Sequence, residues 1–175
     1  MAHLEQRRFF EQVKTDYPKF FQSVSVLEVG SLDINGSLRD LFQDCNYLGV
    51  DVATGKGVDL VAFGQDLSFP DRHFDVCLSA ECFEHNPQWQ ATFTNMTRMS
   101  SGLVIMSCAT TGREEHGTSR CHPGSSPLTV RLWDYYRNLT EQDFTEQLDM
   151  DSMFSEWAFS VNDVSHDLYF VGLVK

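Results

Sequence analysis

Residues 24–30 read VSVLEVG, a short run of β-branched and apolar residues that stops at a glycine. This pattern predicts a buried strand followed by a tight turn. From Gly36 onward, Leu38, Leu41 and Phe42 are spaced to share one face of a helix. The order of strand, glycine turn and helix is typical of the first unit of an α/β fold.

Six further segments predict the remaining strands of one sheet. They are residues 47–51, 59–63, 74–79, 103–106, 156–161 and 168–174. A helix over residues 88–99 and a capping-box pattern that begins at Thr140 fall between them. Strands that alternate with helices predict a mostly parallel sheet covered on both faces. Because few residues separate the last two segments, these two strands must pair antiparallel.

The charge balance is strongly acidic, since 13 Lys and Arg residues against 25 Asp and Glu residues give a net charge of -12. Such a field repels phosphate backbones and anionic lipids, which disfavours nucleic acid and membrane surfaces as partners. No signal peptide is recognisable, and no apolar run approaches the ~20 residues that span a bilayer. These features predict a cytoplasmic protein.

The length of 175 residues suits one domain over residues 1–175. An amphipathic leading helix is expected within residues 1–22, interrupted near Pro18. Residues 110–138 lack any period and are expected to form a long loop on the substrate side. The five cysteines show no paired metal spacing, which predicts free thiols in a reducing compartment.

The loop after the first strand has features of a nucleoside site. Gly30 and Gly36 bracket it, and glycine lets a ligand approach the backbone at the carboxyl end of a parallel sheet. Asp51 follows Gly30 by about twenty residues, the spacing at which a carboxylate accepts ribose hydroxyls. No glycine-rich pyrophosphate fingerprint and no P-loop are present. A ligand with adenosine but no phosphates fits this pattern better than NAD or ATP.

With these motifs the chain resembles the class I S-adenosylmethionine (SAM)-dependent methyltransferases, in particular those of the methyltransferase type 11 kind. The likeness rests on residues 27–30 (LEVG), 47–51 (YLGVD) and 67–76 (LSFPDRHFDV). It implies a Rossmann-like, doubly wound, seven-stranded and mostly parallel sheet with an antiparallel last strand. It also implies that SAM is the cofactor. The net charge of -12 and a length too short for a separate recognition domain predict a small-molecule acceptor, methylated at an oxygen or a nitrogen atom.

The resemblance also assigns the cofactor contacts by segment. The methionine end of SAM would lie on Glu28, Gly30 and Ser31, and its ribose on Asp51; Gly64, Gln65 and Asp66 would border the adenine, and Ser79, Ala80 and Glu81 would lie beneath the methyl group. The family often repeats glycine at every second position of the first loop. This chain instead has GSLDING over residues 30–36, so the loop is expected to turn differently.

Residues 81–85, with the sequence ECFEH, follow the fourth strand. If they turn helically, Glu81, Glu84 and His85 converge on one face. His85 is then a candidate general base beside Glu84. The element also resembles the Glu-x-x-Glu-His metal site of some O-methyltransferases, which His116 or His122 would complete. A solvated acidic turn, with catalysis by orientation alone, is the third interpretation.

Two other classes of function remain open from the sequence. The first is a catalytically silent module that binds SAM or a nucleotide within a larger complex. The second is an NAD-dependent oxidoreductase, which the missing fingerprint disfavours. The sequence does not specify the acceptor, the methylated atom or the oligomeric state.

Overall fold

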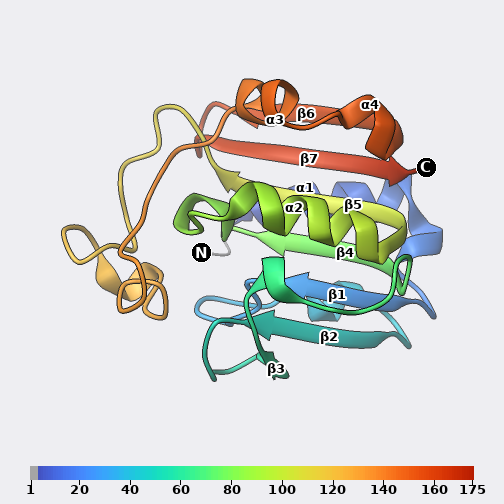
Figure 1. Cartoon of the computed structure of the whole chain (residues 1–175), viewed down its shortest axis with the longest axis horizontal. Helices are drawn as coiled ribbons and strands as arrows, with labels where there is room; N and C mark the ends of the chain where they lie inside the picture. The colour runs from blue at the N-terminus through green and yellow to red at the C-terminus, as the bar shows by residue number, and fades with distance from the viewer. Residues whose placement is uncertain (1–3) are drawn as a thin grey trace.

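A computed structural model describes residues 4–175, so the first three residues of the predicted leading segment lie outside the described residues. A seven-stranded sheet runs through the molecule in the order β3-β2-β1-β4-β5-β7-β6 (Figure 1). The strands are β1 (Ser25–Val29), β2 (Asn46–Asp51), β3 (Leu60–Val61), β4 (Phe74–Ala80), β5 (Ser100–Ala109), β6 (Phe154–Asn162) and β7 (Asp167–Val174). Strand β7 pairs antiparallel with both neighbours, whereas β1 to β5 pair in parallel. The predicted fold class is confirmed.

Helices cover both faces of this sheet, as its two buried faces require. Helix α1 (Leu4–Asp16) packs on one face, where Phe10 and Val13 join the strand residues Val26 and Val76. The other face carries α2 (Trp89–Met99), α3 (Glu141–Gln147) and α4 (Met150–Met153). Figure 1 shows α2 in front of the sheet and α1 behind it.

The predicted capping box is present at the start of α3. The Thr140 side chain accepts the backbone N–H of Asp143, and the Asp143 carboxylate accepts the backbone N–H of Thr140 at 2.8 Å. The shorter side chain of aspartate therefore serves where glutamate is usual.

One sequence prediction about secondary structure is wrong. The segment after Gly36 forms only a 3₁₀ turn, η2 (Arg39–Leu41), and not a helix. Leu38, Leu41 and Phe42 are nevertheless buried on the α1 face of the sheet. Few residues separate η2 from β2, and Asp44 among them adopts a positive φ of 52°, so the chain turns back before a regular helix can form.

The order of strands places the site. Strand β1 lies between β2 and β4, so the chain leaves β1 toward one side and returns to its other side. At such a switch point, the loops that follow the strands diverge and leave a crevice at the carboxyl edge. The residues that follow β1, β2 and β4 therefore meet at this edge.

Two further expectations concern the whole chain. No helix in residues 4–175 is both long enough and apolar enough to cross a membrane. All five cysteines are free thiols, as the sequence predicts, and Cys77 and Cys108 are buried.

Candidate active site

A pocket lies at the carboxyl edge of β1, β2 and β4, where the fold predicts a ligand. It brings together seven predicted site residues: Glu28, Gly30, Ser31, Asp51, Ala80, Glu81 and His85. Gln6 of α1 and the consecutive residues 125–129 of the long loop also line it. The pocket is thus built from the leading helix, three strand ends and the long loop.

Asp51 ends β2 and holds the glycine loop in place. Its carboxylate accepts the backbone N–H of Leu32 at 3.0 Å and that of Val52 at 2.7 Å. Burial raises the pKa of this carboxyl above its usual range, although the two N–H donors oppose the rise. Asp51 therefore organises the loop after β1 and faces the pocket at the same time.

Glu28 is a buried carboxylate at the floor of the pocket. The hydroxyl of Tyr47 on the neighbouring strand donates to its Oε2 atom at 2.9 Å. Burial raises the pKa of Glu28 to about 7, and the Tyr47 hydrogen bond opposes part of that rise. Its charge therefore depends on pH near neutrality.

Ser31 contributes an unsatisfied polar atom to the pocket. Its hydroxyl oxygen is buried and has no hydrogen-bond partner among residues 4–175. Buried hydroxyls are normally hydrogen-bonded, so an orphaned one beside a pocket is suited to contact a ligand.

Position 30 requires glycine because of its backbone conformation and because Cys82 lies close to it. Its φ of +83° is unfavourable for other residues, and a Cβ atom there would lie 2.5 Å from Cys82 Cβ. Replacing Gly30 with alanine should therefore lower the free energy of unfolding by about 2–5 kcal/mol, because left-handed strain adds to overpacking. Urea denaturation measures the loss, and Gly124→Ala, where a Cβ meets nothing within 4 Å, should be nearly neutral. Equal stability of the two variants would contradict this account.

Four predicted cofactor residues lie away from the pocket in this structure. Gly64, Gln65 and Asp66 form the 3₁₀ turn η3, which packs against α2. Asn95 of α2 donates to the Gly64 carbonyl at 2.9 Å. Ser79 is fully buried, and its hydroxyl donates to the Val29 carbonyl at 2.8 Å, so it ties β4 to β1.

The turn after β4 differs from the predicted helical face. Residues Phe83–His85 form the 3₁₀ turn η4, and Glu81 stands before it with a φ of 52°. Because Glu81 is not part of the turn, its side chain points toward β5, where its Oε1 atom accepts the Ser107 hydroxyl at 2.9 Å. The expected convergence of Glu81 with Glu84 and His85 is therefore wrong.

The structure brings Glu84 and His85 together with His116, one of the two histidines that the sequence offered to complete a metal site. One potential ligand atom from each lies within 4.8 Å of the others, and all three residues are buried. The Nε2 atoms of His85 and His116 lie 3.9 and 4.0 Å from Glu84 Oε1. Neither carboxylate oxygen of Glu84 has a hydrogen-bond partner among the described residues.

Burial controls the protonation of this cluster. It lowers the pKa of His85 and of His116 to about 4, so both rings are neutral at pH 7. Burial also raises the pKa of the Glu84 carboxyl. The cluster therefore combines neutral imidazoles, which can accept a proton or bind a cation, with a carboxyl that lacks a compensating partner.

Some residues of the site were missed from sequence. Gln6, Phe10 and Val13 share one buried face of α1, so a polar residue on an apolar stripe was the available signal for Gln6. For residues 125–129, which lie within the predicted substrate-side loop, no periodic pattern marks their individual positions.

Residues 27–106 match the family model described as a methyltransferase domain. This segment, 80 of the 175 residues, is similar to methyltransferase domains. The match bears out the predicted enzyme class, a methyltransferase. It spans β1 to β5, and so includes the glycine loop, Asp51 and the turn at Glu84 and His85. Among curated proteins, no sequence matches the chain.

Solved structures resemble nearly the whole of this chain at low sequence identity. The 1,6-didemethyltoxoflavin-N1-methyltransferase of Burkholderia thailandensis, solved with S-adenosylhomocysteine, shares 13% identity at a TM-score of 0.66, over 97% of this chain and 78% of that one. Phosphoethanolamine N-methyltransferase 2 of Haemonchus contortus shares 15% identity at a TM-score of 0.64, over 96% of this chain and 52% of that one. A putative methyltransferase of Haloferax volcanii, in complex with the Trm112 activator, shares 13% identity at a TM-score of 0.57, over 99% of both chains. At these identities the likeness establishes the fold alone.

Proposed function

We propose that this protein transfers a methyl group from SAM to an oxygen or nitrogen atom of a small-molecule acceptor. The observation that carries the proposal is that Glu28, Ser31, Asp51 and His85 all line one pocket. The extent of the domain over residues 1–175 and the cytoplasmic location stay predictions.

The residues of the pocket fit the cofactor. SAM supplies a methyl group already activated on a sulfonium. The Asp51 carboxylate would accept the ribose hydroxyls, and the orphaned hydroxyl of Ser31 would gain a partner at the methionine end. Ionised Glu28 would attract the positively charged amino group of the methionine moiety. Gly64, Gln65 and Asp66 stay predicted neighbours of the adenine.

The affinity for S-adenosylhomocysteine should rise with pH through about 7. Glu28 attracts the ligand's ammonium group only when ionised, and its pKa is about 7. Its ionised fraction grows from roughly one tenth to nine tenths between pH 6 and 8. Calorimetry across this range measures the effect. Tyr47→Phe removes the donor that stabilises the carboxylate, so the midpoint should move upward, and an unshifted midpoint would argue against Glu28 as the titrating group.

The charges around the pocket as a whole favour a neutral or cationic acceptor. Glu28, Asp51 and Glu81 line the pocket, and Glu84 lies beside it, whereas the nearby histidines are uncharged at pH 7. An anionic acceptor would meet an unfavourable field, which adds to the repulsion of nucleic acid by the net charge of -12. A hydroxylated aromatic or a sugar-like compound fits these conditions.

His85 lines the pocket and would receive the acceptor's proton as the methyl group is transferred. Its neutral ring is available for this at pH 7. The group Glu84, His85 and His116 also fits a divalent cation, because two imidazoles and a carboxylate suit zinc or another transition metal better than magnesium. A bound cation would act as a Lewis acid toward an acceptor hydroxyl.

The proposed function is tested by turnover. Purified protein, SAM and a panel of hydroxylated aromatics, sugars and amines should yield S-adenosylhomocysteine with at least one acceptor. Binding of S-adenosylhomocysteine without turnover across the panel would favour the alternative, a silent SAM-binding module. Absence of binding would reject the cofactor site itself.

A further inference from the structure

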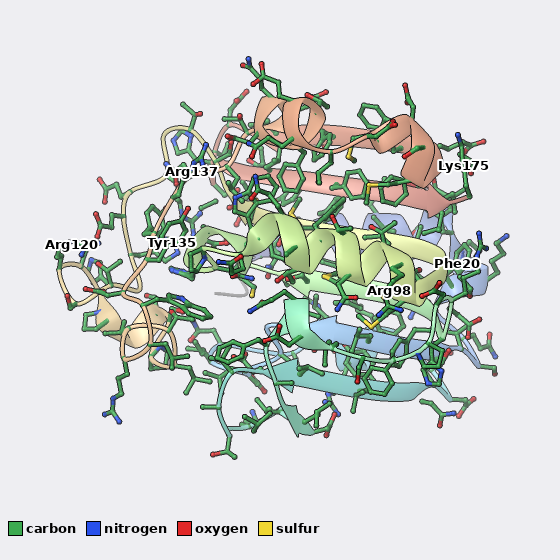
Figure 2. All side chains as sticks on the ribbon, viewed as in Figure 1. Phe20, Arg98, Arg120, Tyr135, Arg137 and Lys175 are labelled. Atoms are coloured by element: carbon green, nitrogen blue, oxygen red, sulfur yellow. The ribbon has the colours of Figure 1, made fainter. Side chains whose placement is uncertain are left out.

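Residues 119–134 form a closed loop whose two ends meet. Asp134 accepts the backbone N–H of Ser119 at 2.6 Å, and Arg120 donates to the same carboxylate at 3.3 Å. Within the loop, the backbone N–H groups of Leu132 and Trp133 both donate to the Thr129 carbonyl at 3.0 Å. A surface loop with joined ends and internal bonds is an Ω-loop, which can move as one body. Figure 2 shows that Arg120, beside these joined ends, lies away from the sheet.

This Ω-loop roofs the cofactor pocket. Its residues 125–129 line the same pocket as Glu28, Gly30 and Asp51. The volume left inside is about 70 Å³, whereas pockets for small molecules measure ~300–1,000 Å³. The roof and the other walls of the pocket must therefore shift to admit SAM.

Trp133 connects the Ω-loop to the turn that carries Glu84 and His85. Its indole N–H donates to the His85 carbonyl at 2.6 Å. Its ring packs on that of Phe63, and the two ring centroids lie 5.6 Å apart. Phe63 directly precedes the predicted adenine segment in the chain. Gly117, at the neck of the loop, approaches the His85 ring so closely that a Cβ would lie 2.6 Å from Cε1. Movement of the loop must therefore change the surroundings of His85.

We propose that residues 119–134 are a flap over the cofactor and that Trp133 is a positioning residue, which fixes the Glu84–His85 turn when the flap closes. The inference rests on the proposed function, since the ligand under the flap is SAM or its product. A ligand that fills the widened pocket and contacts the flap stabilises the closed flap over the open one. The indole hydrogen bond then carries the closure to the His85 backbone. Cofactor binding and placement of His85 are thereby coupled across the pocket.

Hydrogen exchange followed by mass spectrometry tests the coupling, with S-adenosylhomocysteine as the probe. With ligand at about 100 times its Kd, opening is suppressed by up to ~100-fold, so exchange should slow at least ~10-fold in residues 119–134. Residues 82–86, whose turn includes the His85 amide bonded to the Cys82 carbonyl, should be protected as well. In Trp133→Phe, which keeps a ring but loses the indole N–H, the flap should still be protected and residues 82–86 should not.

The matched control is Trp157→Phe on β6. This variant also loses an indole hydrogen bond, to Asp151 at 3.0 Å, but lies at the far edge of the sheet and should behave as wild type. Calorimetric binding without a change in exchange would overturn the flap and leave the proposed function intact. Equal protection of residues 82–86 in wild type and Trp133→Phe would overturn the role of Trp133. Absence of calorimetric binding would reject the cofactor site, and the flap with it.

Discussion

Replacing His85 with alanine is expected to slow methyl transfer by about 10²–10⁴-fold and to leave the affinity for S-adenosylhomocysteine nearly unchanged. The ring lines the pocket and is neutral at pH 7 because burial lowers its pKa to about 4. It acts on the acceptor and not on the cofactor, so kcat should fall while cofactor binding persists. Single-turnover rates with the acceptor identified by the panel, together with calorimetry, measure the two quantities.

The same experiment separates a base from a metal ligand. His73, which is exposed and lies just before β4, provides the matched control, and His73→Ala should retain full activity. If the cluster holds a metal, a chelator should abolish wild-type activity, added Zn²⁺ or Mn²⁺ should restore it, and His116→Ala should lose that response. Wild-type turnover in His85→Ala, with no sensitivity to chelator, would leave orientation alone as the mechanism.

Replacing Asp51 with alanine should weaken S-adenosylhomocysteine binding by about 10- to 150-fold, or ~1.5–3 kcal/mol. The variant loses the carboxylate proposed for the ribose hydroxyls and also the acceptor for the Leu32 and Val52 N–H groups. The second loss loosens the loop that carries Gly30 and Ser31. Calorimetry measures the affinity, and unchanged binding would reject the assignment of this edge as the cofactor site.

The Asp51→Asn variant distinguishes the two losses. Its amide oxygen can still accept one backbone N–H, so the loop should be partly retained while the charge is removed. We expect its affinity to lie between those of wild type and Asp51→Ala. An affinity as low as that of Asp51→Ala would assign the whole effect to the carboxylate charge.

The sequence predicts the fold well because alternating strands and helices leave few arrangements. The run at residues 24–29, the aspartate at the end of the second strand and the antiparallel terminal pair need only local patterns, and all three positions are found in the structure. Gly30 and Asp51 meet because parallel strands bring their carboxyl ends to one edge.

The site is less predictable because its details depend on backbone angles and on contacts between distant residues. Glu81 adopts a positive φ before the turn and accepts a hydrogen bond from Ser107 on β5, which no spacing rule indicates. His116 reaches Glu84 through a loop with no periodic pattern. The 3₁₀ turn at Arg39–Leu41 buries its leucine as a helix would, so the apolar pattern alone does not distinguish the two structures.

The position of β7 between β5 and β6 has a consequence for synthesis of the chain. Strand β5 is almost wholly buried, yet one of its edges is covered only by β7, which begins 58 residues after Ala109. Translation at ~5–20 residues per second therefore leaves this edge of an apolar strand unpaired for about 3–12 s. The nascent protein then holds the strands of its pocket but also exposes an edge on which other chains can pair. A chaperone that binds extended apolar segments is expected to cover β5 during this interval.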